Sequence, residues 1–230
     1  SPIIQDNTLI ASDKGITCKN SNPTIQNNNI SQNYNYGINC SNCTGIIQGN
    51  VIAENGIGIE LWGNSSSNIV YHNNLMNNTE QAPITEGLNV WDNGAEGNYW
   101  SDYAGVDSNH DGIGDAVHVM DANNTDRYPL MGMFSDFNAT LEHNVQIVCN
   151  SSLSNFVFNG AVITFDAAGK DNTTGFCRIC IPTDLINETY RIFVNRTEVQ
   201  YSTLSCSNTT HKYLYFNYAH PREKVLIINA

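Results

Sequence analysis

The 230-residue sequence predicts an all-β protein: a short parallel β-helix over residues 1–133, followed by an immunoglobulin-like antiparallel β-sandwich over residues 134–230. Two observations predict this organisation. A pattern of 21 to 23 residues occurs four times between residues 3 and 78, and short alternating apolar segments follow from Phe134 onward. A period near 22 residues, with Asn and Gly at fixed places, favours parallel β-helix coils over helical repeats.

The repeats share an apolar residue, an asparagine and, in three of them, a Gly-Ile step. The apolar residues are Ile4, Ile25, Ile47 and Val70; the asparagines are Asn7, Asn28, Asn50 and Asn73; the steps are Gly15-Ile16, Gly37-Ile38 and Gly58-Ile59. Coils stacked at about 4.8 Å would turn these positions into inward aliphatic stacks and a ladder of amides. Asn also suits a corner, because it tolerates the left-handed backbone region. We expect Ser1 to be a mature or trimmed end, and Ile84–Val90 to form a last partial coil.

The chain has few charged residues, and they are unevenly distributed along the sequence. The net charge is −12, and the residues through Phe134 include 14 acidic and 3 basic side chains. Such a surface offers phosphates no basic stripe, so a nucleic-acid partner is excluded and cations are the natural partners of the first half. The sequence has no run of 18 apolar residues, so it predicts no transmembrane helix.

Asn-x-Ser/Thr sequons are frequent, with 12 among 35 asparagines. This excess predicts covalent N-glycans on an exterior face and an extracellular or cell-surface location; composition alone is the alternative explanation. The sequons begin at Asn29, Asn39, Asn42, Asn64, Asn77, Asn123, Asn138, Asn150, Asn172, Asn187, Asn195 and Asn208.

Seven cysteines fit an exported chain, because export permits disulfides. The disulfide candidates are Cys18, Cys40 and Cys43 in the repeats, and Cys149, Cys177, Cys180 and Cys206 near the C-terminus. Four cysteines in the second domain allow three connectivities, which stay open. Cys18 and Cys40 occupy equivalent coil positions, but parallel Cβ vectors disfavour an ideal bridge between them. The odd total leaves at least one thiol free or paired with another subunit.

Aromatic residues follow the coils. We expect Trp91, Tyr99, Trp100 and Tyr103 to cover the open end of the β-helix; a sugar-stacking platform is the alternative.

The next segment has the alternating-oxygen spacing of a calcium loop. The expected Ca²⁺ ligands are Asp107, Asn109, Asp111, the Ile113 carbonyl and Asp115, with Asp121 completing the shell. Gly112 permits the turn, but His118 stands where an EF-hand has its bidentate Glu, so a structural ion is favoured over a sensor. A solvated Asp/Asn turn is the plain alternative.

Together, the repeats, GNYWSDYAGVDSNHDGIGD and DANNTDRYPL resemble secreted archaeal surface proteins with NosD-type right-handed parallel β-helix repeats. Those repeats are shared with carbohydrate-binding and sugar-hydrolase β-helices. The resemblance covers roughly residues 3–131 and implies an extracellular, surface-associated chain, but no single activity.

From Phe134 onward, eight short apolar segments at roughly ten-residue spacing predict the sandwich. They are Val145–Cys149, Phe156–Phe158, Ala161–Asp166, Gly175–Ile181, Tyr190–Val194, Val199–Ser202, Lys212–Tyr218 and Lys224–Ile228.

The sequence favours a structural role over catalysis. The coils offer only Lys14 and Lys19 as bases for a lyase, and none of their carboxylates forms the evident close pair that a hydrolase needs. We therefore expect no enzyme and no catalytic residue, but a glycosylated, self-assembling homo-oligomeric subunit of a cell-surface filament, sheath or surface layer. A carbohydrate-binding or adhesive module using Trp62, Trp91 and Trp100 is the alternative, and a polysaccharide-processing enzyme a weaker one.

Overall fold

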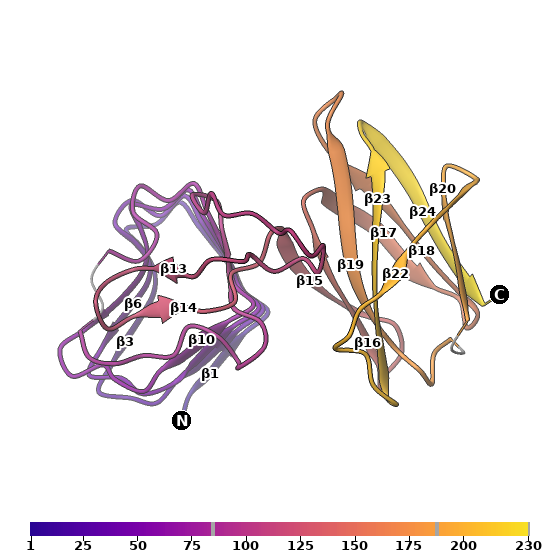
Figure 1. Cartoon of the computed structure of the whole chain (residues 1–230). Coiled ribbons are helices and arrows are strands. Elements are labelled where there is room, and N and C mark those ends of the chain that lie inside the picture. Colours follow the sequence, from indigo (N-terminus) through magenta and orange to yellow (C-terminus); the bar gives the residue numbers. More distant parts are fainter. Residues whose placement is uncertain (84–85, 187–188, 230) are drawn as a thin grey trace. The chain divides into compact units, whose positions relative to one another are not determined.

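The computed structural model describes residues 1–83, 86–186 and 189–229. Within these residues the chain forms strands, turns and loops, and no helix long and apolar enough to cross a membrane is present (Figure 1). The chain divides into two compact units. The first comprises Ser1–Ser108 and Ile113–Leu130, and the second comprises Asn109–Gly112 and Met131–Ala230.

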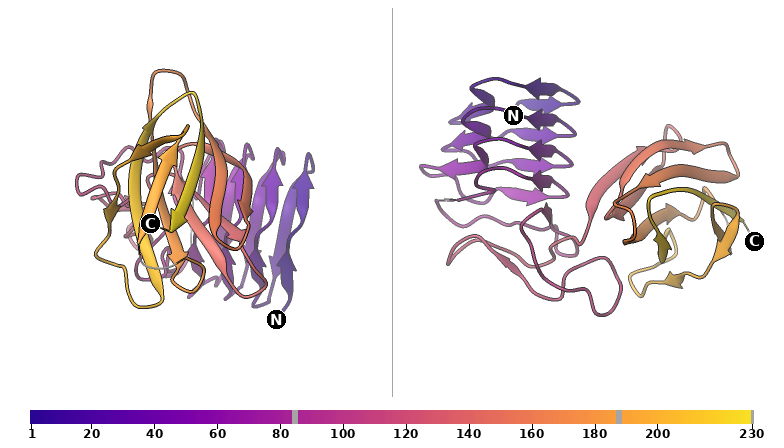
Figure 2. Two further views of the ribbon diagram at one scale, coloured as in Figure 1. Left: turned by 90° about the vertical axis from the view of Figure 1, so that its right-hand side faces the viewer. Right: turned by 90° about the horizontal axis from the view of Figure 1, so that it is seen from above.

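The first unit is a parallel β-solenoid with three short strands per coil (Figure 2). The first sheet has the order β1-β4-β7-β10: Ile3–Gln5, Thr24–Gln26, Ile46–Gln48 and Ile69–Tyr71. The second has the order β12-β11-β8-β5-β2: Tyr99–Trp100, Asn74–Met76, Val51–Ala53, Asn29–Ser31 and Thr8–Ile10. The third has the order β3-β6-β9: Lys14–Lys19, Tyr36–Ser41 and Ile57–Trp62.

The strand registers confirm both predicted aliphatic stacks. Ile4 pairs with Ile25, Ile25 with Ile47 and Ile47 with Val70, while Ile16 pairs with Ile38 and Ile38 with Ile59. Ile25, Ile47 and Val70 are fully buried. At roughly 1.5–3 kcal/mol per fully buried side chain, these stacks are a main stabilising contribution.

Close packing between coils explains the glycine of the Gly-Ile step. A Cβ on Gly37 would lie 2.8 Å from the carbonyl oxygen of Gly58 and 2.9 Å from Cγ2 of Ile52. A Cβ on Gly15 would lie 2.6 Å from the carbonyl oxygen of Gly37. The repeated glycine therefore lets one coil approach the next.

The predicted amide ladder is present and has a single direction. Asn28 donates from its backbone N–H and its Nδ2 to Oδ1 of Asn50, at 3.0 and 2.9 Å. Asn7 donates in the same way to Asn28, and Asn50 to Asn73. The ladder continues to Asn98, which the repeat alignment did not include. Each buried amide is thereby satisfied by the next coil.

Two further ladders were not predicted. Asn33, Asn55 and Asn78 form one, and Asn68, Asn89 and Asn124 form the other. Their spacings are 21 to 23 residues, as in the repeat, except for the last step of 35 residues from Asn89 to Asn124, so the sequence held a signal for them.

The corner geometry differs from the expectation in one respect. The left-handed residue is the one before the ladder asparagine: Asp6, Asn27, Gly49 and His72 have φ between 54° and 65°. The ladder asparagines are not left-handed. Their side chains serve the inter-coil hydrogen bonds instead.

The second unit contains two five-stranded antiparallel sheets. The order β15-β16-β19-β23-β22 corresponds to Met133–Asn138, Asn144–Cys149, Thr174–Pro182, His211–Ala219 and Ser202–Thr203. The order β17-β18-β24-β20-β21 corresponds to Ser152–Phe158, Val162–Ala168, Arg222–Asn229, Tyr190–Val194 and Thr197–Val199.

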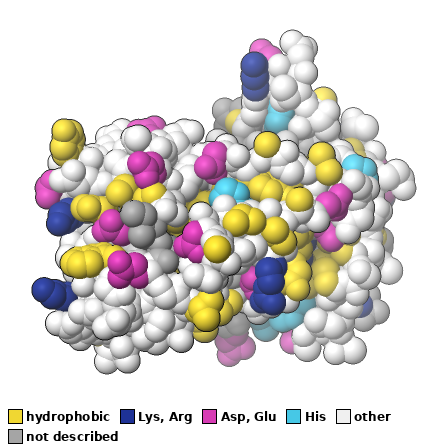
Figure 3. All heavy atoms as spheres, turned by 60° about the vertical axis from the view of Figure 1, so that its left-hand side comes forward, with side chains coloured by type: hydrophobic (Ala, Val, Ile, Leu, Met, Phe, Trp, Pro, Cys, Tyr) yellow, Lys and Arg dark blue, Asp and Glu magenta, His cyan; other side chains and the backbone are white. Residues whose placement is uncertain are grey.

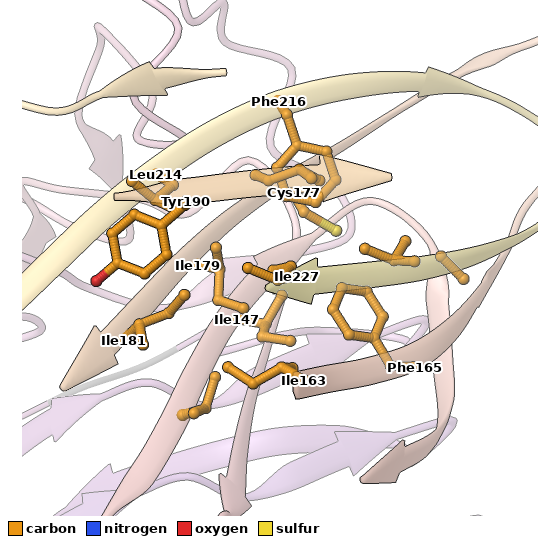
Figure 4. Packing of buried hydrophobic residues seen from close by; sticks show 14 of the residues in the cluster. Ile147, Ile163, Phe165, Cys177, Ile179, Ile181, Tyr190, Leu214, Phe216 and Ile227 are labelled. Carbon is orange, nitrogen blue, oxygen red and sulfur yellow. The ribbon is translucent and has the colours of Figure 1, made fainter. Parts of the chain in front are cut away.

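One hydrophobic core joins the two sheets. Ile147, Ile179 and Phe216 come from the first sheet, and Phe165 and Ile227 from the second (Figure 4). The eight predicted segments all contain strand, although the predicted Val199–Ser202 strand is split between β21 and β22, and β15 was missed. The immunoglobulin-like topology stays a prediction.

The buried ladder predicts unequal effects of two substitutions in one coil. Asn28→Ala removes amide bonds to Asn7, Asn50 and two backbone carbonyls, so we expect a loss of about 3 kcal/mol in the free energy of unfolding. Gln26, in the more exposed ladder with Gln5 and Gln48, is the matched control; Gln26→Ala should cost at most about 0.5 kcal/mol. Urea unfolding measures both, and equal losses would contradict a dominant buried ladder.

Candidate functional sites in the solenoid unit and in the chain

The far end of the solenoid is closed by an incomplete coil. Tyr99 and Trp100 of β12 pair with Asn74 and Leu75 of β11, and Val90 bridges to Ile69. Val90 thus confirms one end of the predicted partial coil, while Ile84 and its neighbour Thr85 lie outside the described residues.

Trp91 and Trp100 have exposed fractions of 0% and 1%, and their ring centroids are 5.6 Å apart. They belong to the same hydrophobic cluster as the coil core, against which Tyr103 packs. The predicted aromatic cap is therefore confirmed for these residues. The sugar-stacking alternative is wrong for Trp91 and Trp100, because neither ring can reach a ligand, whereas Trp62 is 44% exposed.

A buried carboxylate ends the first ladder. Oδ2 of Asp126 accepts the backbone N–H of Asn98 at 2.8 Å and the indole N–H of Trp100 at 2.8 Å, and its Oδ1 accepts the N–H of Tyr128 at 3.0 Å. Because every amide of this ladder donates toward this end, the final rung needs an acceptor. Asp126 supplies one.

Glycine is required beside this carboxylate. A Cβ on Gly97 would lie 1.8 Å from Oδ1 of Asp126. The distinctive Gly97-Asn-Tyr-Trp segment thus combines a close approach, a ladder asparagine and an indole donor around one acceptor. Asp126 belongs to the later Asp-Arg-Tyr-Pro-Leu segment, so the two motifs of the sequence meet at this point.

Burial raises the pKa of Asp126 to about 6, against hydrogen bonds from Trp100, Asn98 and Tyr128 that act in the opposite direction. Asp92 behaves differently. Burial raises its pKa too. However, Nε and Nη2 of Arg127 donate to the two carboxylate oxygens of Asp92 at 2.8 and 2.6 Å. These bonds and the N–H of Gly94 hold the pKa of Asp92 below its usual range.

Two histidines lie in the first unit near this end. His118 of β13 (His118–Val119), which pairs with β14 (Thr125–Asp126), stacks on Trp100 at 4.4 Å. Burial lowers the pKa of His118. His72 Nε2 lies 2.8 Å from a carboxylate oxygen of Glu96, and both side chains are nearly buried. These histidines serve local packing and hydrogen bonding.

The residues predicted to bind calcium are divided between the two units. Asp107, Ile113, Asp115 and Asp121 lie in the first, and Asn109 and Asp111 in the second. Gly112 has φ +81°, the turn conformation the motif predicts.

Local hydrogen bonds order parts of this loop. Asp115 accepts the Ser108 N–H at 3.0 Å, which lowers the pKa of Asp115, and Asn109 donates to Asp111 at 2.9 Å. Asp121 accepts both Nδ2 and the backbone N–H of Asn124, so its carboxylate already ends the third ladder. Across the described chain, no group of three or more His, Cys, Asp or Glu side chains is placed to hold a metal ion. Calcium binding, which also uses Asn and carbonyl oxygens, stays a prediction.

Most sequons have room for a glycan. Asn29, Asn42, Asn64, Asn77, Asn123, Asn138, Asn150, Asn172, Asn195 and Asn208 are exposed. Asn39 is the exception, because it is 6% exposed and its Nδ2 donates to Glu60. Asn187 lies outside the described residues. Figure 3 shows that, on the face it draws, most of the surface is neither apolar nor charged.

The cysteines carry thiols in this structure, and all except Cys206 are buried. Cys18 and Cys40 are register partners on successive coils, as their repeat positions predict. A hydrogen bond from Cys40 lowers the pKa of Cys18 to about 7, and the same contact raises that of Cys40. Cys43 Sγ donates to the carbonyl oxygen of Ser41, within a corner.

The carboxylates considered for hydrolysis each have a structural contact. Oε2 of Glu54 accepts Nε2 of Gln32 at 3.0 Å, and Glu60 accepts Nδ2 of Asn39. Burial raises the pKa of Glu60. Sequence reasoning missed the ladder roles of Asn98, which continues the first ladder, and of Asp126 and Asp121, which end the first and third. Asn98, 25 residues after Asn73, is the one the repeat could have revealed.

The raised pKa of Asp126 predicts a pH effect on stability. In the folded state Asp126 keeps its proton up to about pH 6, whereas in the unfolded state it loses the proton near its usual pKa of 3.8. The stabilisation from the protonated form is therefore fully present below about pH 3.8 and is lost as the pH rises through 6. We expect this group to lower the free energy of unfolding by about 3 kcal/mol across that range. Urea unfolding between pH 4 and 7 measures the change.

Asp126→Asn is the control, since it cannot titrate. His118, with a lowered pKa, acts in the opposite direction and is present in both proteins, so the difference between them isolates Asp126. The same pH dependence in both proteins would show that Asp126 does not titrate in this range.

Residues 1–105 match the family described as "Periplasmic copper-binding protein (NosD)". A 63-residue segment is 36% identical to a "Probable ABC transporter binding protein NosD" of Stutzerimonas stutzeri, covering 27% of this chain and 14% of that protein. A 67-residue segment is 35% identical to the protein of the same description from Pseudomonas aeruginosa, covering 29% and 16%.

Among solved structures, the Dettilon tailspike protein (gp208) aligns over 99% of this chain and 56% of its own, with 12% identity and a TM-score of 0.30. That likeness is too low to support an argument. The curated relatives are matched over about a sixth of their length or less. What the comparisons do show is that the solenoid residues 1–105 are similar to the NosD family.

Proposed function

We propose that this chain is a non-enzymatic structural protein outside the cytoplasm, a glycosylated subunit that self-associates at the cell surface in a filament, sheath or surface layer. The word "periplasmic" in the description of the matching family supports a location in or beyond the cell envelope. Ten exposed sequons support a glycosylated exterior, and the observed parallel solenoid supplies a rigid body.

The observation that carries the proposal is the strand edge of the first described coil, which exposes apolar side chains. One end is closed by Trp91, Trp100 and Asp126. At the other, β1, β2 and β3 are the edge strands of their sheets, and Ile3 and Ile10 are 66% and 45% exposed. Edge strands with apolar side chains favour addition of another strand.

The occupant we propose for this edge is the same edge of a second copy. At the closed end, the edge strands β9, β10 and β12 are bridged by Glu80, Val90 and Leu130. The proposed contact joins the same edge of two copies, so it is self-complementary and produces a pair. A filament or sheath then needs a second contact elsewhere on the chain. Lys14 and Lys19 on β3, Asp13 directly before β3 and Asp6 between β1 and β2 provide opposite charges in the first coil.

Copper does not follow from the family description. Residues 1–105 contain one histidine, His72, which contacts Glu96, and the described residues contain no group of three His, Cys, Asp or Glu side chains placed for a metal. We therefore derive no copper role. The carbohydrate-binding alternative retains only Trp62, since the other two tryptophans are buried.

Association through the edge is tested by light scattering coupled to gel filtration. We expect the mass of the full chain to rise from that of one copy to that of two copies as its concentration increases. The double variant Ile3→Lys/Ile10→Lys should keep the mass of one copy. Leu141→Lys, at a fully exposed position of the second unit, is the matched control and should still associate. A single-copy mass for the unsubstituted chain at all concentrations, with and without calcium, would contradict the proposal.

Calcium is the proposed cofactor of the Asp107–Asp115 loop. An ion that binds only the folded state raises stability by about 2.7 kcal/mol at one hundred times its dissociation constant, so calcium should raise the melting temperature and chelator should reverse the effect. Asp111→Ala should abolish the response, whereas Asp102→Ala, an exposed acidic residue before the loop, should preserve it. A melting curve indifferent to calcium would identify the loop as a plain turn.

A further inference from the structure

Cys149 and Cys177 lie opposite each other in the second unit. They are direct partners in the antiparallel pairing of β16 with β19, and both are 0% exposed. Their Sγ atoms are 3.0 Å apart. Non-bonded heavy atoms ordinarily lie about 3.5–4.0 Å apart, so the two thiols are in unusually close contact. Opposed Cα atoms in antiparallel strands lie about 4.5 or 5.5 Å apart, which is within the range of about 4.4–6.8 Å found for disulfides.

The other cysteines are less well placed. Cys18 and Cys40 stack on parallel strands about 4.8 Å apart with Cβ atoms pointing the same way, whereas disulfide Cβ atoms lie about 3.5–4.5 Å apart. Cys180 is on β19 but outside the shared core, and Cys206 is exposed. Register and burial therefore favour one pair among the four cysteines of the second unit.

Hydroxyl groups surround the sulfur pair. The Tyr218 hydroxyl lies 3.1 Å from Sγ of Cys149 and 3.6 Å from Sγ of Cys177. Ser151 Oγ lies 2.7 Å from the same hydroxyl and 2.6 Å from Nε2 of His220. These contacts hold Tyr218 against the sulfurs, and they connect the pair through His220 to Thr173, which is exposed. The chain of groups offers a route for protons leaving the thiols.

We infer that Cys149 and Cys177 form a disulfide as the exported chain folds, which selects one of the three connectivities that the sequence leaves open. The oxidant is a donor disulfide, R–S–S–R. A thiolate of the pair attacks one donor sulfur and releases RS⁻; the second thiolate then attacks the mixed disulfide and releases the other RS⁻. The two protons from the cysteines balance the two thiols formed, and the donor takes up the two electrons.

The bond has a distinct consequence in the folded chain. Because both sulfurs have no exposed surface, a reductant reaches them only when β16 and β19 separate. The disulfide should therefore resist reduction under native conditions and become reducible on unfolding. It closes the segment that carries β17 and β18, and so limits the freedom of the unfolded chain.

Peptide mapping of the full chain tests the inference. The chain is refolded with oxidised glutathione, alkylated in denaturant and digested without reductant. We expect a Cys149 peptide linked to a Cys177 peptide, which separates after reduction. Two alkylated peptides, or either cysteine linked to Cys180 or Cys206, would overturn the assignment, and this result does not depend on whether the chain self-associates.

A second measurement uses variants. Reductant applied during unfolding should lower the melting temperature of the unsubstituted chain by roughly 10 °C, and should have no such effect on Cys149→Ser/Cys177→Ser. Cys206→Ser is the matched control and should keep the full response. If the double variant does not fold, the melting temperatures of the reduced and oxidised forms of Cys206→Ser still decide the outcome. A difference below about 2 °C between these two forms would contradict the bond.

Discussion

The first unit depends on a hydrogen-bonded column of amides that runs in one direction. From Asn7 to Asn73, the side-chain amide and the backbone N–H of each asparagine donate to Oδ1 of the ladder asparagine in the next coil, which for Asn73 is Asn98. A buried amide without a partner is costly, so each rung is stable only with the rung that follows it. The ladder of Asn33, Asn55 and Asn78 ends on the side-chain oxygen of Gln81, whose Nε2 donates to Ser101. The first ladder ends differently. It ends on Asp126, whose carboxylate only accepts when ionised.

This ending explains residues that otherwise look unrelated. Gly97 leaves room for the carboxylate of Asp126, Trp100 donates to that carboxylate, and Asp121 ends the third ladder in the same way. The aromatic and aspartate segments of the sequence are thus one structure that closes the solenoid. The proposed association is placed at the opposite edge, where β1, β2 and β3 are the edge strands.

The repeats made the solenoid predictable, since Ile and Asn recur with a spacing that only stacked coils satisfy. The left-handed corner residues were misplaced by one position, because Asp6, Asn27, Gly49 and His72 share a backbone conformation and no side-chain chemistry. Asp126 was missed because it lies 28 residues beyond Asn98, after a loop that interrupts the period. From the sequence, Trp91 and Trp100 fitted either a cap or a sugar-stacking platform, and only their burial in the structure distinguishes the two roles. In the second unit, the alternation of apolar and polar residues located most strands. Which strands pair depends on long-range register, and that register places Cys149 opposite Cys177.

Native-state hydrogen exchange of the backbone N–H groups of Asn28, Asn50, Asn73 and Asn98 tests the central claim most directly. If the directional column holds the coils together, these amides exchange together and only when the whole unit unfolds, far more slowly than the N–H of Asn64 in an exposed corner. Exchange of the four asparagines at separate rates, or as fast as Asn64, would contradict the account.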